Sequence, residues 1–538
     1  MLPTETTMTL SKSNFLQYLR HPAWLWLEKH NKSILPLIDD NTQAIFDAGN
    51  LFESYAEQLF PDGVTLGYKT NGQFDGKKYW ALPDTTKRAL KEKVPVLFQG
   101  RLEVEGITCI FDVLERNENG TYNLYEIKSS TKAKPEHEHD LAFQTIVLEK
   151  SGLSIESIFV IHVNNEYVRN GDIPPEEITD VTEVTSAVRA KLPQTVIDIE
   201  NAIAVMEATE MPDPSPRHAG LGSFSAWLEI YNILNPRLDP YSIYKLCTPG
   251  ARRIGELEDE GIQTIGDIPD DENLTVKQRY QVQATQLGTR IIKHDEIETF
   301  LETFQYPLYF FDYETLASVV PAFDGMRPYQ QVPFQYSLHI LQSPTAPLEH
   351  REFLHTENTS PVPHLVEQLK RDIGTTGSVV VWYQGFEKGC NTTLAELMPE
   401  HREFLYALND RIVDLMIPFS EGWYVDKDFF GSASIKAVLP VLVPELSYKD
   451  LAIHDGGTAQ NTWMSTVLGG KNQDRKDTIM KDMRTYCTLD TLAMVKIWEI
   501  LSKKLHEENH TVQRQLTVVK NVSEGLTAEP QVFQKPLF

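Results

Sequence analysis

One stretch of the sequence constrains the fold and chemistry of this chain more than any other: an apolar and aromatic run ending in two carboxylates, at residues 307–318. Leu308 to Phe311 predict a β-strand with both faces covered. Because side chains at positions i and i+2 of a strand point the same way, Asp312 and Glu314 are expected on one face. Neighbouring carboxylates repel each other unless a cation lies between them. The sequence therefore predicts a site for Mg²⁺ or Mn²⁺, with a solvated acidic turn as the alternative.

Two later segments supply residues that would complete this site. A β-branched strand at 378–383 leads into Glu387, and a predicted helix carries Tyr486 and Asp490 four residues apart, on the same face. The order Asp-x-Glu, then an acid after a strand, then Tyr-x-x-x-Asp resembles the motif set of the DEDD exonucleases, in their tyrosine subgroup. The position that would carry histidine in the other subgroup is Thr485. The resemblance implies a fold similar to ribonuclease H.

The resemblance also implies the roles of these residues. Phosphodiester hydrolysis builds charge on the attacking and leaving oxygens, and two metal ions about 3.5–4 Å apart can stabilise both. Tyr486 is expected to orient the attacking water through its phenolic oxygen. Four carboxylates are expected to hold the metal ions and so to act in catalysis: Asp312, Glu314, Glu387 and Asp490. Glu387 departs from the family, in which Asp is usual, and Asp414 is a reserve candidate whose expected role is structural.

A second set of candidates lies in the first third of the chain. Turn residues near positions 105 and 119 predict hairpins that place Asp112 beside a strand carrying Glu126 and Lys128. One residue separates Glu126 from Lys128, so both point the same way. This Asp and Glu-x-Lys arrangement resembles the PD-(D/E)XK nucleases, in which carboxylates hold a metal ion and the lysine stabilises phosphate charge or positions water. An exposed ion pair of no consequence is the alternative.

Residues on the flanking helices resemble the RecB-like branch of these nucleases. Gln144 follows the Glu-x-Lys strand and Glu53 precedes it. The resemblance implies that Gln144 contacts the nucleic acid and that Glu126 and Lys128 act in catalysis. The expected metal ligands are Glu53, Asp112 and Glu126. One departure is Leu148, where the branch often has tyrosine.

Relatives of this branch that act in CRISPR adaptation carry an iron–sulfur cluster. Their early cysteine is replaced here by His21, and their later cysteine group is absent between His218 and Tyr231. We therefore expect no iron–sulfur cluster. The four cysteines are scattered along the sequence, which argues against a disulfide framework or a zinc ribbon.

Through these motifs, and through segments such as RPYQQVPFQYSLHI and GSASIKAVLPVL, the chain resembles a bacterial family known mainly as a domain of unknown function. The resemblance covers about residues 8–505 and implies an α/β chain in four parts. These are a RecB-like PD-(D/E)XK domain with a restriction-endonuclease-like fold at 1–205, a helical connector at 206–298, a ribonuclease-H-like DEDD exonuclease domain at 299–508, and a tail at 509–538. Residues 251–270 of the connector resemble a helix-hairpin-helix that binds DNA backbone, with a helical spacer as the alternative.

Four further residues are candidates for nucleic-acid contacts. Arg327 and Tyr329 are expected near the metal site of the C-terminal domain, where they could clamp a terminal nucleotide by charge and stacking. A structural turn is the alternative for this pair. Arg475 and Lys476 lie just before the last motif and could contact phosphates, although runs of charge are usually solvated.

Length and charge limit the possible classes of function. A chain of 538 residues is too long for one core and predicts two or three domains. Its net charge of -26 predicts weak nonspecific DNA affinity and a need for divalent ions, and is compatible with a local basic groove. No apolar run approaches the roughly 20 residues of a membrane span, and residues 1–10 lack the regions of a signal peptide. We expect a cytoplasmic protein without a membrane partner.

Together these patterns predict a metal-dependent nuclease with two centres, one a 3′-5′ exonuclease and one RecB-like. The expected substrates are single-stranded DNA, duplex DNA ends or RNA, with DNA favoured, and the expected setting is DNA repair or antiviral defence. A helicase or a defence-system protein is a candidate partner. The alternative is a nucleic-acid-binding or scaffolding subunit of a larger complex, in which one nuclease centre is degenerate.

Overall fold

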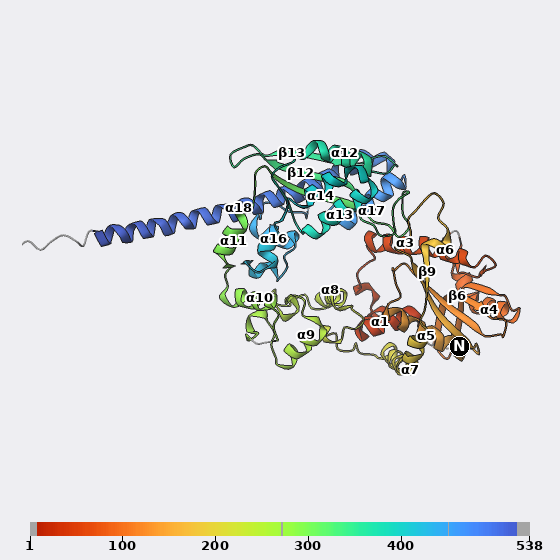
Figure 1. The fold of residues 1–538 in the computed structure, drawn as a ribbon. Coiled ribbons are helices and arrows are strands. Elements are labelled where there is room, and N and C mark those ends of the chain that lie inside the picture. Colours follow the sequence, from red (N-terminus) through yellow and green to blue (C-terminus); the bar gives the residue numbers. More distant parts are fainter. Residues whose placement is uncertain (1–7, 71, 271–272, 450, 525–538) are drawn as a thin grey trace, which may run out of the picture.

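The computed structural model of the protein describes residues 8–70, 72–270, 273–449 and 451–524 (Figure 1). Its architecture is mixed α/β: two main β-sheets are joined by a mostly helical segment. We refer to the N-terminal region (8–207), the connector (208–293) and the C-terminal region (294–524). In Figure 1 the N-terminal region is red to yellow, the connector is yellow-green to green, and the C-terminal region is green to blue.

The N-terminal sheet is an antiparallel meander followed by a parallel strand, in the order β2-β5-β6-β7-β8-β9 with β1 beside β6. Glu105 and Gly106 have positive φ (50° and 78°), as a two-residue hairpin turn requires, so β5 and β6 are adjacent. β8 pairs parallel to β7 after a helical crossover. The main strands are β5 (Val96–Val104), β6 (Ile107–Arg116), β7 (Tyr122–Lys128) and β8 (Ile155–Val163). The shorter strands are β1 (Leu10–Ser11), β2 (Val64–Thr65) and β9 (Thr179–Glu183).

Helices cover this sheet, and one of them is almost entirely buried. Helix α5 (Pro135–Lys150) is the crossover between β7 and β8 and packs against both the sheet and α7 (Thr185–Glu207). Ser11 caps α1, and the next helix begins at Pro22, because proline is favoured in a first helical turn. The other helices are α1 (Lys12–Arg20), α2 (Pro22–His30), α3 (Asp40–Ala56), α4 (Gly76–Lys91) and α6 (Pro175–Ile178). Strands β3 (Lys69–Thr70) and β4 (Gln73–Phe74) form a separate hairpin.

The connector has a small apolar core of its own. Its core side chains are Ile243, Leu246, Ile254, Leu257, Ile265, Ile268, Leu274 and Val282. Its helices are α8 (Phe224–Leu234), α9 (Gly250–Asp259) and α10 (Val276–Leu287). Gly261 follows α9 with a φ of 74°, which favours glycine. A two-stranded ladder between β10 (Ile291–Ile292) and β16 (Tyr424–Val425) ties the connector to the C-terminal region.

The C-terminal sheet has the order β13-β12-β11-β14-β15. β11, β12 and β13 are antiparallel neighbours, whereas β14 and β15 run parallel to β11. The strands are β11 (Leu308–Leu316), β12 (Val332–Leu341), β13 (Glu349–Leu354), β14 (Ser378–Val381) and β15 (Ile412–Asp414). The helices are α11 (His294–Leu301), α12 (Val362–Asp372), α13 (Gln384–Leu397), α14 (Arg402–Asn409), α15 (Ile417–Ser420), α16 (Ile435–Leu442), α17 (Gly456–Trp463) and α18 (Lys476–Glu524).

Helix α18 lies across β11 and β12 and then continues well past the sheet (Figure 1). Residues 509–524, which the sequence analysis assigned to a tail, are helical and belong to α18. Neither glycine nor proline interrupts that stretch before Gly525, so nothing in it breaks a helix. The rest of the predicted tail, 525–538, lies outside the described residues.

The N-terminal and C-terminal regions share an apolar core. Val319, in the loop between β11 and β12, is buried against Phe52 of α3 and Ile127 of β7. Helix α3 also packs on α17, where Asn461 donates a hydrogen bond to Asn41 (Nδ2–Oδ1 2.8 Å). These contacts set the two regions against each other. None of the helices in the described part of the chain combines the length and apolar character that a membrane crossing requires.

Candidate functional site

The first predicted site is a buried acidic cluster between β11 and α18. Asp312 and Glu314 project from one face of β11, and Asp490 comes from the helix that packs on that face. Glu314 is 6% exposed and Asp490 8%. Burial, and then the charge of Asp490, raise the pKa of Asp312 well above its usual range; burial and Asp312 do the same for Glu314. The structure therefore brings these three carboxylates together.

Two tyrosine hydroxyls flank Asp490. Tyr448 donates a hydrogen bond to Asp490 (Oη–Oδ1 2.6 Å), and its ring centroid lies 6.1 Å from that of Tyr486. Burial raises the pKa of Asp490 to about 6, and the bond from Tyr448 limits that rise. Burial and the neighbouring carboxylates raise the pKa of Tyr486 far above its usual value, so its hydroxyl stays protonated. Tyr486 thus lies at the edge of the cluster, as predicted, and Tyr448 is a residue that the motif search missed.

Cys487 is a second residue that sequence reasoning did not place here. Its sulfur lies 4.0 Å from Asp312 Oδ2, and one ligand atom from each of Asp312, Glu314 and Cys487 lies within 4.8 Å of the others. Burial raises the pKa of its thiol well above the usual value, so it stays a neutral neighbour of the carboxylates in the metal-free protein. Its position directly after Tyr486 on the inner face of α18 explains the proximity.

Glu387 comes from the first turns of α13 and is 1% exposed. Its Oε2 is buried and has no hydrogen-bond partner among the described residues. Burial, then the charge of Asp312, raise the pKa of Glu387 well above its usual range. Asp414 has the structural role expected for it: its carboxylate accepts hydrogen bonds from the backbone N–H of Tyr383 (3.0 Å) and of Gln384 (2.9 Å). These bonds hold the start of the helix that carries Glu387.

This cluster fits hard divalent cations. A buried carboxylate oxygen without a partner, as in Glu387, is costly unless a cation approaches it. Lys436 lowers the pKa of both Asp312 and Glu314, yet each stays well above its usual range. The donor set is mainly carboxylate oxygen, which suits Mg²⁺ or Mn²⁺.

The second predicted site lies on β6 and β7 of the N-terminal region. Glu126 is 1% exposed, and the backbone N–H of Ile127 donates to Asp112 Oδ2 (2.8 Å). Burial, and then the charge of Glu126, raise the pKa of Asp112 to about 8. Glu53 on α3 belongs to the same electrostatic group, because burial raises its pKa and Glu126 adds to the rise. Gln99 donates a hydrogen bond to Glu53.

Two residues of this site were missed from the sequence: Lys12 of α1 and Asp140 of α5. Lys12 Nζ lies 2.9 Å from Glu126 Oε1 and 3.6 Å from Asp140 Oδ1. Lys128 Nζ lies 2.7 Å from Glu126 Oε1 and 2.9 Å from Asp140 Oδ2. Burial alone would raise the pKa of Glu126, but the two ammonium groups hold it below the usual value. Asp140 precedes Gln144 by four residues on one helix face, which is the signal that could have found it.

Gln144 has a different role from the one predicted. It is fully buried, and its Nε2 donates to Glu126 Oε2 (2.7 Å) and to Asp140 Oδ1 (2.9 Å). A side chain enclosed in this way holds the carboxylates in place and does not face a nucleic acid. Both oxygens of Glu126 are therefore occupied, Oε1 by the lysines and Oε2 by Gln144.

The other predicted nucleic-acid contacts do not gather at the C-terminal cluster. Arg327 forms an ion pair with Glu396 of α13, whereas the Tyr329 hydroxyl donates to the carbonyl of Ser129, one residue after Lys128. These two side chains therefore do not form a joint clamp. Lys476 Nζ donates to the carbonyl of Thr356 (2.7 Å), which is a structural contact. Arg475 is exposed at the start of α18.

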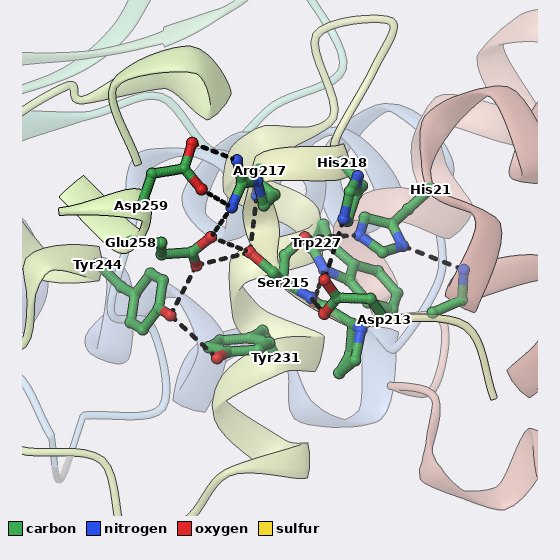
Figure 2. Close-up of polar contacts among 12 residues, drawn as sticks. His21, Asp213, Ser215, Arg217, His218, Trp227, Tyr231, Tyr244, Glu258 and Asp259 are labelled. Carbon is green, nitrogen blue, oxygen red and sulfur yellow. Dashed lines mark hydrogen bonds and ion pairs between the residues drawn. The ribbon is translucent and has the colours of Figure 1, made fainter. Parts of the chain in front are cut away.

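The segment around His21 and the segment that contains His218 and Trp227 meet in space (Figure 2). His21 stacks on Trp227 with ring centroids 3.8 Å apart, and its Nε2 lies 3.0 Å from the carbonyl oxygen of Ser215. Burial lowers the pKa of His21 to about 4. Next to this stack, Glu258 accepts hydrogen bonds from Ser215 and Tyr244. The four cysteines are all free and lie in other parts of the chain.

Comparisons with known proteins relate the chain to an uncharacterized family and to uncharacterized proteins. Residues 309–434 match a family model described as a domain of unknown function (DUF2779). The uncharacterized protein MG366 of Mycoplasma genitalium is 24% identical over 208 residues, which are 35% of this chain and 31% of that protein. The MG366 homolog of Mycoplasma pneumoniae is 24% identical over 205 residues, 35% of this chain and 31% of its own length. UU173 of Ureaplasma parvum is 23% identical over 224 residues, 37% of this chain and 31% of its own.

The matched family segment includes Asp312, Glu314 and Glu387 and ends before Asp490. The chain spans 31% of the length of each of these three relatives. Residues 309–434 are similar to the DUF2779 family, and the chain is distantly similar to these three proteins.

Proposed function

We propose that the protein is a metal-dependent nuclease whose C-terminal region is a 3′-5′ exonuclease of the DEDD type and whose N-terminal region is a RecB-like PD-(D/E)XK nuclease. One observation carries the proposal. Asp312 and Glu314 meet Asp490 in one buried cluster, although nearly the whole C-terminal region separates them in sequence. Folding would not gather mutually repelling carboxylates away from water without a function for them.

The order of the strands supports the C-terminal assignment. Three antiparallel strands are followed by two strands parallel to the first, with helices in the connections, as expected for a ribonuclease-H-like sheet. The first strand and the last helix then carry the acids at one place. The N-terminal meander with a helical crossover to a parallel strand likewise suits a restriction-endonuclease-like core.

In the C-terminal centre, the four acids Asp312, Glu314, Glu387 and Asp490 would hold the metal ions. Bound divalent ions supply stabilisation of the negative charge on the attacking and leaving oxygens. Tyr486, protonated and beside Asp490, can position a water molecule through its hydroxyl. Tyr448 fixes the orientation of Asp490 through its hydrogen bond. Burial of the site excludes bulk water and so strengthens these interactions.

A specific observation favours a second candidate function for the N-terminal region. Both oxygens of Glu126 already accept hydrogen bonds, from two lysines and a glutamine, so a metal ion would have to compete with these partners for the carboxylate. The second candidate is therefore a protein in which the N-terminal centre is degenerate and only binds nucleic acid or scaffolds a complex. Under either candidate, nucleic acid is the partner, and DNA repair or antiviral defence is the proposed setting.

The test is incubation of the full chain with end-labelled single-stranded and duplex DNA and RNA, with Mg²⁺, Mn²⁺ or EDTA. The expected result is metal-dependent shortening from 3′ ends that Asp312→Asn abolishes. Intact substrates with every metal would refute the nuclease proposal.

The two candidates for the N-terminal region are separated in the Asp312→Asn background. If this centre is active, residual cleavage remains there, and Lys128→Ala removes it. Lys12→Met is the matched control, because Lys12 makes a similar contact with Glu126 (2.9 Å against 2.7 Å) but comes from another helix. Residual cleavage that persists in the Lys128→Ala variant would refute the catalytic role of Lys128. If the Asp312→Asn protein shows no residual cleavage at all, the result would support a degenerate N-terminal centre.

A further inference from the structure

A surface pocket of about 470 Å³ lies at the end of β7, and both regions of the protein line it. Its lining residues are 128–131, Lys134, Glu136, His137 and Tyr329. All but Tyr329 belong to the end of β7, to the loop after it and to the start of α5. Tyr329 belongs to the loop between β11 and β12 of the C-terminal region. A residue from one region therefore borders the candidate centre of the other.

The loop on the N-terminal side is locally basic in a chain of net charge -26. Residues 128–134 read Lys-Ser-Ser-Thr-Lys-Ala-Lys, with three lysines, three hydroxyls and no acid. The side chains of Lys128 and Lys134 are partly open to solvent. Glu136 also borders the pocket and lies 3.8 Å from Lys134. Ammonium groups and hydroxyls are the usual contacts of phosphate groups, and Lys128, whose ammonium binds Glu126 and Asp140, keeps a third N–H for such a contact.

Tyr329 is held in place from both sides. Arg169 of the N-terminal region donates to the carbonyls of Pro321 (2.8 Å) and Ala322 (2.9 Å) in the same loop. Tyr329 itself adopts a φ of 59°, which is uncommon for a residue other than glycine and persists only where the surroundings enforce it. Its hydroxyl is bound to the carbonyl of Ser129, and the residue remains 40% exposed. The ring is thus fixed at one end and open beside the lysines.

We propose that this pocket binds single-stranded nucleic acid, with the ring of Tyr329 stacking on a base and Lys128 and Lys134 contacting the phosphates. A fixed, open aromatic ring beside cationic side chains is the arrangement that binds unpaired bases irrespective of sequence. A duplex does not offer a free base face, so the pocket selects single strands. The nucleic-acid site of the N-terminal region is then completed by the C-terminal region. This inference rests on the proposed function only in assuming that the N-terminal region receives nucleic acid.

The test measures binding without chemistry. The full chain carries Asp312→Asn and is titrated in EDTA against fluorescent single-stranded and duplex oligonucleotides, with anisotropy as the readout. We expect Tyr329→Ala to weaken single-strand binding about five- to tenfold and to leave duplex binding unchanged. Tyr329→Phe, which keeps the ring and loses the contact with Ser129, should bind like the parent. Tyr406→Ala is the matched control, because Tyr406 is 41% exposed in the same region but lies on α14.

Lys134→Ala tests the phosphate contact independently. It should reduce the slope of log affinity against log salt for single strands by about 0.7. Tyr329→Ala with parental single-strand affinity would overturn the proposal, as would equal losses for Tyr329→Ala and Tyr329→Phe.

Photo-crosslinking of the unsubstituted chain to an iodouracil oligonucleotide covers the case in which Tyr329→Ala does not fold. The expected adduct lies on the peptide containing Tyr329, and adducts elsewhere alone would contradict the pocket. Because binding is measured in EDTA, its failure is distinguishable from failure of the nuclease proposal, which concerns cleavage with metal.

Discussion

At the residue scale, the two tyrosines beside Asp490 have separable roles. Tyr448 donates directly to Asp490 and stabilises its charged form more than Tyr486 does, while Tyr486 lies at the edge of the cluster with a hydroxyl that stays protonated. The first hydroxyl orients a metal ligand. The second is the candidate for positioning water.

This division predicts different kinetics for two equivalent substitutions. Tyr486→Phe should lower turnover about 100-fold while the affinity for Mn²⁺ is unchanged, because the ring packing and the ligands remain. Tyr448→Phe should weaken Mn²⁺ binding and turnover together, since it removes the bond that holds Asp490. Calorimetric Mn²⁺ titration and cleavage rates check both. Equal losses of Mn²⁺ affinity in the two variants would refute the assignment.

A pH prediction follows from the other centre. Burial and Glu126 raise the pKa of Asp112 from 3.8 to about 8, so the folded state binds this proton more tightly than the unfolded state. Stability should therefore fall as the pH rises toward 8 in EDTA. Asp112 accounts for about 2 kcal/mol between pH 6.5 and 8. The pH range begins at 6.5 because of His21 and His339, whose pKa values are lowered to about 4. These two histidines make stability rise with pH, but only below pH 6.5.

Urea unfolding in EDTA at pH 6.5 and 8 measures this effect, and Asp112→Asn should make the dependence less steep, while the raised pKa values of Asp312, Glu314 and Glu387 act in the same direction in both proteins. Asparagine keeps the acceptor for the backbone N–H of Ile127, so the fold has no other reason to change. A wild-type protein that gains stability over this interval, or a variant with the same slope, would contradict the prediction.

The sequence predicted the candidate site residues that belong to short motifs with a fixed spacing. It missed the residues that tertiary packing brings to the sites from distant parts of the chain. Asp112, Glu126 and Lys128 follow from strand alternation and a hairpin turn, so local geometry brings them together. Lys12 and Tyr448 come from separate elements, at positions that only tertiary packing fixes. Gln144 was expected to contact nucleic acid, whereas the structure buries it against Glu126 and Asp140, because no local pattern shows that residues 140–148 of α5 are buried.

At the scale of elements, the contact between β12 and α18 determines whether Asp490 reaches β11. In sequence β12 alternates apolar and polar residues, yet the whole strand is buried. Three of its polar side chains bind α18: Gln335 donates to the carbonyl of Met483 (3.1 Å), and Ser337 (2.7 Å) and His339 (2.8 Å) share the Thr491 hydroxyl. Such an alternation does not show that a helix covers the polar face of the strand. It also carries no information on the length of α18, which extends to Glu524.

Thr491→Val is expected to destabilise this contact. The substitution preserves shape but leaves the buried His339 Nδ1 without its partner, at a cost of about 1–3 kcal/mol. Thermal unfolding should show a lower Tm, and exonuclease activity should fall because Asp490 is the preceding residue. Thr485→Val is the control, since Thr485 is exposed on the same helix. A Tm equal to that of the control would show that the hydroxyl network does not hold α18.

At the scale of the whole molecule, the two sheet regions are joined by more than the connector. Val319 enters the core formed by α3 and the N-terminal sheet, and Arg169 binds the loop that carries it. The sequence motifs predicted separate regions and carried no signal for this contact, which brings an apolar side chain of a loop together with polar contacts from distant segments. An apolar contact of this kind couples the stabilities of the regions it joins.

The last prediction tests that coupling. The full chain should unfold in one calorimetric transition in EDTA, and Thr491→Val should shift the whole transition, because unfolding of the C-terminal region exposes the core around Val319. Val319→Asp places a charge in that core, which should separate the transition into two. In the Val319→Asp protein, Thr491→Val should then shift only the transition of the C-terminal region.

Val276→Asp is the matched control, because Val276 is 67% exposed on α10 and its substitution should leave the single transition intact. Two independent transitions in the unsubstituted chain would show that the regions fold separately and that Val319 does not couple them.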